Sequence, residues 1–104
     1  MRKAILIISI VFFTCENTNS RLTIGTPFDL SYDSRAGYDE ACDLPLTVVF
    51  YHNGNFIHPG LGNIVYQDQS MNNPFDGGNK WRMTLWGAIK ISPVGRIIDF
   101  NNCN

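Results

Sequence analysis

The chain has 104 residues, 44% of them hydrophobic and 16% charged, and a formal net charge of −1. That length suits a single domain, and the near-neutral charge argues against a dedicated nucleic-acid-binding protein. The three cysteines are an odd number, so their interpretation depends on how the N-terminus is processed.

The first twenty residues predict a signal peptide. Arg2 and Lys3 precede an apolar run, 4–13, that is roughly half as long as a membrane-spanning helix. The polar segment 16–20 then ends this run. We therefore divide the chain into a signal peptide, 1–20, and a single mature β domain, 21–104.

Two processing routes fit this N-terminus. A general signal peptidase could cleave after Ser20. Alternatively, Phe12-Phe13-Thr14-Cys15 resembles the bacterial lipoprotein box, in which the cysteine is lipidated. We favour lipidation of Cys15, because this cysteine stands where the apolar run ends. Both routes predict export, either to the cell envelope on a lipid anchor or to the extracellular space.

Two cysteines, Cys42 and Cys103, remain in the mature domain. An even pair in an exported chain favours a disulfide. The bridge would close a loop of about 60 residues and would stabilise the fold by roughly 4 kcal/mol in the chain-entropy model. Neither cysteine has a second cysteine or a histidine at the short spacing typical of a zinc site.

The hydrophobic pattern predicts an all-β domain, a small antiparallel sandwich or meander of about five to seven strands. Strands are expected over 28–32, 46–51, 55–58, 61–67 and 80–91, followed by a last strand that reaches Phe100. The segment 46–51 is apolar on both faces, as is typical of a central strand. The segments 33–43 and 68–79 predict loops, the first with one helical turn.

Two turns define the predicted hairpins. Asn53-Gly54 predicts a two-residue turn between 46–51 and 55–58. Ser92-Pro93-Val94-Gly95 has the proline and glycine positions of a type I turn. Closing this second turn pairs Ile89 with Ile98 and Gly87 with Phe100. The residues predicted to share one face of this hairpin are Leu85, Gly87, Ile89, Ile98 and Phe100.

The predicted strand 80–91 carries the candidate binding face. Its outward side would hold a tryptophan among three cations: Lys80, Arg82, Trp86 and Lys90. An exposed indole is typical of surfaces that stack on sugars or contact proteins. Tyr66 could extend this face, and Trp81 is predicted to lie on the opposite, core side. The competing interpretation is that a second sheet covers the face and makes Trp86 part of the core.

The histidines do not make a strong metal or catalytic motif. His52 and His58 are six residues apart and flank turns, so both are predicted to be exposed to solvent. A small nuclease could combine Glu40 or Asp43 with His52 and Arg82, but no spacing singles out that set. The loop 72–78 has calcium-like residue types without EF-hand spacing. We predict no catalytic residue, no metal and no cofactor.

Several motifs lie between Gly62 and Cys103. They are Gly62-Asn63-Ile64-Val65-Tyr66, Asp68, Asn73-Pro74-Phe75-Asp76-Gly77-Gly78-Asn79, Trp81, a hairpin turning at Gly95, and Cys103. Together they resemble a small β module of bacterial surface proteins and phage tail proteins, which implies a β fold without an activity or a defined ligand site. Val48 to Tyr51 with Asn55-Phe56 is similar to the opening of a βγ-crystallin Greek-key motif, although His58 replaces the usual glycine.

Taken together, the sequence predicts an exported cell-envelope binding or interaction module without catalytic activity. Its partner would be a protein or a carbohydrate of unknown identity and not a nucleic acid. The module would meet a membrane only through the lipid anchor. One alternative is a secreted hydrolase inhibitor that presents Met71 and Phe75 on the loop 68–79, and another is a small secreted hydrolase.

Overall fold

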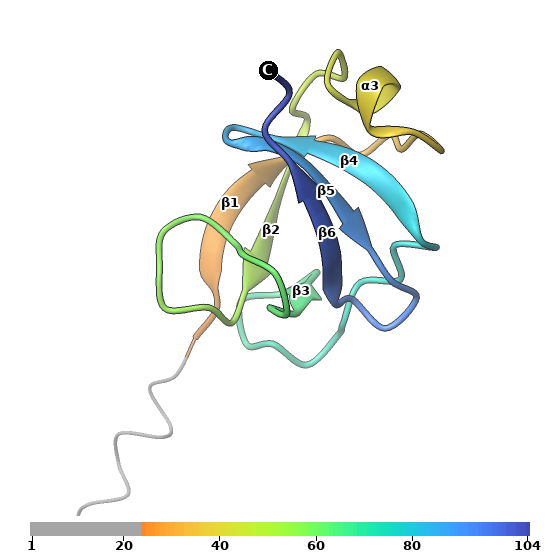
Figure 1. Cartoon of the computed structure of the whole chain (residues 1–104). Coiled ribbons are helices and arrows are strands. Elements are labelled where there is room, and N and C mark those ends of the chain that lie inside the picture. The colour runs from red at the N-terminus through yellow and green to blue at the C-terminus, as the bar shows by residue number, and fades with distance from the viewer. Residues whose placement is uncertain (1–23) are drawn as a thin grey trace, which may run out of the picture.

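The computed structural model describes residues 24–104, which form an antiparallel β structure with one short helical turn (Figure 1). The predicted lipidation at Cys15 and the predicted cleavage after Ser20 lie outside the described residues. The elements in chain order are β1 (Thr26–Leu30), α3 (Tyr38–Ala41), β2 (Val48–His52), β3 (Val65–Tyr66), β4 (Lys80–Thr84), β5 (Gly87–Ile91) and β6 (Ile97–Asn101).

The six strands form one sheet with the order β3-β2-β1-β4-β5-β6, and every neighbouring pair is antiparallel. The sheet curls until its two ends meet. Hydrogen bonds join Gly62 N–H to the Ile97 carbonyl (2.9 Å), Ile97 N–H to the Asn63 carbonyl (2.9 Å) and Val65 N–H to the Gly95 carbonyl (2.7 Å). The all-β prediction is confirmed, and the sheet closes on itself as a small barrel.

The inner face of this sheet holds the main core. Along β1, Phe28 and Leu30 are buried while Pro27 and Asp29 are exposed, and Phe28 lies opposite Phe50 of β2. The buried members of this cluster come from four strands: Phe28, Leu30, Val65, Ile89, Ile91 and Ile97. Burying each such side chain contributes about 1.5–3 kcal/mol, so the barrel interior is the principal source of stability.

A second cluster covers the outer face of β4 and β5. The short helix α3 lies over this face (Figure 1), and the Tyr38 ring packs edge-on against Trp81 at 5.7 Å. The cluster contains Ala41, Leu44, Trp81 and Ala88, with Met83 at its border. The predicted disulfide between Cys42 and Cys103 is present beside it, with a Cα–Cα distance of 5.7 Å. Trp81 is therefore buried, but under α3 and outside the main core.

The prediction of one continuous strand over 80–91 is wrong, because these residues form the hairpin of β4 and β5. Thr84 pairs with Gly87, and Leu85 and Trp86 form the turn. The Thr84 hydroxyl accepts the Trp86 N–H (3.1 Å) and donates to the Gly87 carbonyl (2.7 Å). Gly87 has φ 141°, a conformation that side-chain-bearing residues rarely adopt. Sequence periodicity continues through this turn, so the pattern alone hides it.

The turn at 92–95 is confirmed, but the predicted strand pairing beyond it is wrong. Gly95 N–H donates to the Ser92 carbonyl (3.0 Å), and Gly95 has φ 89°, which adds a third residue to the loop. A second irregularity lies between Lys90 and Ile91. Ile89 consequently pairs with Phe100 instead of Ile98. Ile98, Phe100 and Leu85 are 44%, 41% and 64% exposed, so the predicted shared apolar face does not form.

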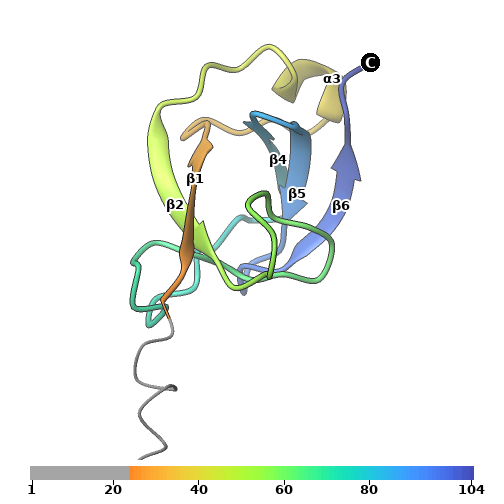
Figure 2. The same cartoon turned by 90° about the vertical axis from the view of Figure 1, so that its left-hand side faces the viewer.

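The predicted strand 55–58 is absent. The antiparallel partner of β2 is β3, with Tyr51 opposite Tyr66 and His52 opposite Val65. Residues 53–64 form one long loop between these strands. In the turned view of Figure 2 this loop lies in front of the barrel. Asn53-Gly54 therefore begins a long connection, and the expected two-residue hairpin does not form.

Candidate functional site

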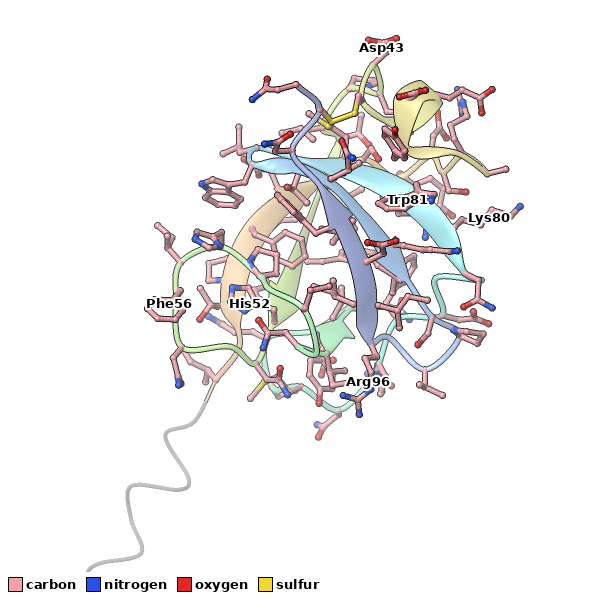
Figure 3. The ribbon with its side chains drawn as sticks, viewed as in Figure 1. Asp43, His52, Phe56, Lys80, Trp81 and Arg96 are labelled. Atoms are coloured by element: carbon pink, nitrogen blue, oxygen red, sulfur yellow. A yellow bond between two sulfur atoms is a disulfide. The ribbon has the colours of Figure 1, made fainter. Side chains whose placement is uncertain are left out.

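The residues of the predicted binding face lie on different sides of the molecule. Lys80 is the first residue of β4, whereas Trp86 lies beyond its last residue. Figure 3 shows Lys80 on the far side of the molecule from Phe56, a residue of the loop that contacts Trp86 through His58. Because the hairpin reverses the chain after Thr84, Arg82 pairs with Ile89, whereas Lys90 pairs with Trp81 on the other face. The prediction that Trp86 and the three cations share one face is therefore wrong. Of these four residues, only Trp86 lies at an apolar surface.

Arg82 is a half-buried structural cation. Its guanidinium carbon lies 4.6 Å from the centre of the Phe75 ring, a cation–π contact. Its Nε donates to the Tyr32 carbonyl and its Nη1 donates to the Gly77 carbonyl, both at 3.3 Å. Arg82 thus joins the loops on either side of β4. Two of its N–H donors and one face of its guanidinium are already engaged within the fold, so it is a poor candidate for binding a partner.

His52 organises the loop 53–64 from inside the barrel. Its side chain is completely buried, which corrects the prediction that it is exposed. Gly54 N–H donates to Nδ1 (3.0 Å), so the ring proton sits on Nε2, which lies 3.2 Å from the Ile57 carbonyl. Burial lowers the pKa of the imidazole, and the Ile57 carbonyl opposes this change. Figure 3 places His52 between the loop and the strands.

An aromatic stack runs from this loop to the β4–β5 turn. The Phe56 and His58 rings are stacked at 6.3 Å with an interplanar angle of 18°, and the His58 ring lies 5.4 Å from the Trp86 ring. Trp86 also packs against the main core. The loop and the turn, separated by about 30 residues in sequence, therefore meet at His58.

Exposed apolar side chains surround this stack. Phe56 is 74% exposed, Ile57 70%, Leu61 66% and Leu85 64%. Single exposed apolar residues are ordinary, but a group of large ones on adjacent segments marks an interaction surface. The loop 53–64 contains no Asp, Glu, Lys or Arg. Binding at this loop would therefore not require an Asp, Glu, Lys or Arg of the loop to lose its hydration.

An apolar hollow lies on one side of the stack. It has a volume of about 270 Å³ and is lined by Pro27, Phe28, Asp29, Val49, Ile57, Leu85 and Trp86. Val49 stands on the outer side of β2, and Tyr51 follows two residues later on the same side, opposite Tyr66. Tyr66 therefore belongs to the same outer sheet face as the hollow, farther along the strands.

An asparagine-lined pocket lies on the other side of the stack. We call it the asparagine pocket, with a volume of about 330 Å³ and a lining of Asn53, Gly54, Asn55, Phe56, His58, Gly60, Leu61 and Asn63. Asn53 Oδ1 accepts the Ile64 N–H (2.8 Å), and Asn63 Oδ1 accepts the Gly60 N–H (2.7 Å). These backbone donors fix which end of each amide is oxygen, so each NH₂ group faces away from them.

The nuclease set does not assemble. Both ring nitrogens of His52 are engaged by backbone groups, and Figure 3 shows Asp43 at the opposite end of the barrel. Within residues 24–104, no three His, Cys, Asp or Glu side chains gather as a metal-binding group. Over the same residues, the structure has no helix long and apolar enough to span a bilayer.

The loop 68–79 is ordered by its own side chains. The Asp68 carboxylate accepts the Ser70 hydroxyl (2.6 Å) and the Asn73 N–H (2.9 Å), and these bonds, the hydroxyl first, lower its pKa. Phe75 packs against Phe50 at 4.7 Å and lies under Arg82. Phe75 is therefore a packing residue, whereas Met71, the other residue of the inhibitor hypothesis, is half-buried in this loop.

The sequence interpretation identified Trp86 but missed Phe56, Ile57 and Leu61. A signal was present, because residues 53–64 contain three glycines, three asparagines and a proline, a composition typical of loops. Apolar residues inside such a segment are candidates for an exposed binding surface when the segment does not pair with a strand. Comparison of the chain with protein-family models, curated proteins and solved structures gave no match. The two resemblances noted in the sequence stay predictions.

Proposed function

We propose that the protein is an exported, non-catalytic binding module of the cell envelope, and that it contacts its partner through the loop 53–64 and the β4–β5 turn. The observation that carries this proposal is the group of exposed apolar residues around Trp86 and His58. Hot spots of binding surfaces are enriched in tryptophan and surrounded by contacts that exclude water. The Cys42–Cys103 bridge is compatible with an oxidising compartment.

The apolar hollow offers a direct test of this surface. Leu85→Ser removes an exposed apolar side chain at the turn, and Val94→Ser is a matched control because Val94 is 66% exposed in a different turn. We expect the purified domain to co-sediment with envelopes of its native host. Leu85→Ser should weaken this binding about tenfold, the effect of losing one contact of about 1.4 kcal/mol. Equal binding of both variants would contradict the proposal.

Attachment to the envelope has its own test. Mass spectrometry of the processed N-terminus should find a diacylated Cys15 if the protein is lipid-anchored. A chain that begins at Arg21 would show that the protein is secreted without a lipid anchor. The binding surface would still be tested by the sedimentation experiment above.

A further inference from the structure

We propose that the asparagine pocket binds a neutral pyranose sugar; this inference rests on the proposed function and names its ligand class. The pocket combines an exposed aromatic ring, Phe56, with amides from Asn53, Asn55 and Asn63. A pyranose has an apolar face of C–H groups and a rim of hydroxyls. The ring suits the apolar face, and the amides suit the hydroxyls.

The charge of the lining selects a neutral ligand. None of the eight lining residues is an Asp, Glu, Lys or Arg. A phosphate or carboxylate ligand would need a cation or several backbone donors, and an ammonium ligand would need an acid or an open aromatic cage. The volume of about 330 Å³ lies at the small end of ligand pockets, which fits one sugar ring better than a folded peptide segment.

The amide donors are held in place before any ligand arrives. Asn53 and Asn63 each use their oxygen on a backbone N–H of the same loop, and among residues 24–104 neither NH₂ group makes a hydrogen bond. The Asn63 amide lies directly against the backbone of Gly54, where a Cβ would not fit. Two fixed donors beside an aromatic ring reduce the ordering cost of binding a hydroxyl-rich ligand.

The experiment is a titration of the ¹⁵N-labelled domain by ¹H–¹⁵N correlation NMR. The probes are methyl glucoside, methyl galactoside, methyl mannoside and N-acetylglucosamine, tested one at a time. We expect at least one of them to cause saturable shifts of amides within 53–63. If none of the four moves these amides, the inference is wrong.

Isosteric variants test the contacts. Asn63→Asp keeps the oxygen that accepts the Gly60 N–H but removes the NH₂ donor, and Phe56→Ala removes the ring. Each should weaken the sugar affinity about tenfold, the effect of one lost polar or stacking contact. Asn102→Asp is the matched control, because Asn102 also accepts a backbone N–H, that of Asn104 (3.1 Å), away from the pocket. Unchanged affinity in Asn63→Asp and Phe56→Ala would overturn the assignment of the pocket.

The two proposals fail in distinguishable ways. If no sugar binds and the domain still co-sediments with envelopes in a Leu85-dependent manner, the sugar inference is wrong and the binding module stands. If sugar shifts appear and depend on Asn63 and Phe56, the inference stands whatever the sedimentation result.

Discussion

At the scale of single residues, His52 has the most specific role. It is buried and neutral, and it accepts from Gly54 while facing the Ile57 carbonyl, so its ring holds the start of the loop 53–64. A protonated ring would lose the Gly54 bond, since both nitrogens would then be donors. The loop that carries the exposed apolar residues thus depends on the neutral form of one histidine.

This dependence predicts how stability changes with pH. The pKa of His52 is lowered in the folded state, so the unfolded chain binds the proton more readily, near its ordinary pKa of about 6.5. The stabilisation is complete above pH ~6.5 and declines as the pH falls below it toward the lowered folded value. Urea unfolding between pH ~5.5 and 8 should show the free energy of unfolding rising with pH up to about the unfolded pKa and levelling off above it.

The control for this titration is the second histidine. His52→Gln should flatten the slope of unfolding free energy against pH, whereas His58→Gln should only reduce it, because burial is the larger and the electrostatic effect of His58 the smaller of the two causes that lower the His52 pKa. A slope that persists in His52→Gln would show that another group is responsible.

Gly87 is the second residue with a specific constraint. Its φ of 141° is outside the range of most side-chain-bearing residues, and a Cβ there would collide with the Asn101 carbonyl. We expect Gly87→Ala to lower the free energy of unfolding by about 2–3 kcal/mol, the range for combined strain and overpacking. Gly37→Ala, where a Cβ meets nothing within 4 Å, should change it by less than about 0.5 kcal/mol. Similar unfolding curves for both variants would contradict this account.

At the scale of elements, Arg82 connects β4 to two loops. Arg82→Met removes the hydrogen bonds to the Tyr32 and Gly77 carbonyls and the contact with the Phe75 ring, so it should cost about 1–2 kcal/mol in unfolding free energy. The exposed Lys80 provides the comparison, because Lys80→Met should cost less than about 0.5 kcal/mol. Chemical denaturation of both variants measures the difference. A larger loss of unfolding free energy in Lys80→Met than in Arg82→Met would contradict the structural role given to Arg82.

The elements also show what the sequence could predict. Local signals were sufficient for the turn at 92–95, the loop 68–79, the helical turn within 33–43 and the central position of the strand around Phe50. The hairpin turn at Leu85 and Trp86 contains no residue typical of turns, and Thr84 closes it through its hydroxyl. Periodicity continued past that turn, so every side-chain direction before it was inverted.

The proposed binding site was predictable only in part, for a related reason. Trp86 was identifiable by its type. Phe56 and Ile57 resembled a strand, and their exposure depends on β2 choosing Val65 and Tyr66 as its partner in place of the nearer segment 55–58. Which strands pair depends on how the whole core is buried. Local sequence patterns do not contain that long-range information.

At the scale of the whole molecule, the disulfide joins the segment after α3 to the C-terminus. The sequence separation of Cys42 and Cys103 is 61 residues, and a loop of this size corresponds to a stabilisation of roughly 4 kcal/mol. Reduction should therefore lower the melting temperature by roughly 15–30 °C in a domain of this size. Circular dichroism melting with and without dithiothreitol measures this shift. The Cys42→Ala/Cys103→Ala variant should melt like the reduced protein and should not respond to reductant, and an unchanged melting temperature on reduction would contradict the assigned contribution.

The burial of β5 on both sides has a consequence for how the molecule opens. Ile89 and Ile91 point into the barrel while Ala88 packs under α3, so this strand belongs to both hydrophobic clusters. The outer part of the loop 53–64 is held by His52 and by the contact of His58 with Trp86, whereas Gly62 and Asn63 hydrogen-bond to Ile97 of β6. Local opening of the segment 53–58 would break the His52 and His58 contacts but leave the bonds of Gly62 and Asn63 to β6 in place. In the proposed function, the doubly packed strand β5 maintains the fold, and the outer part of the loop 53–64 adapts to the partner.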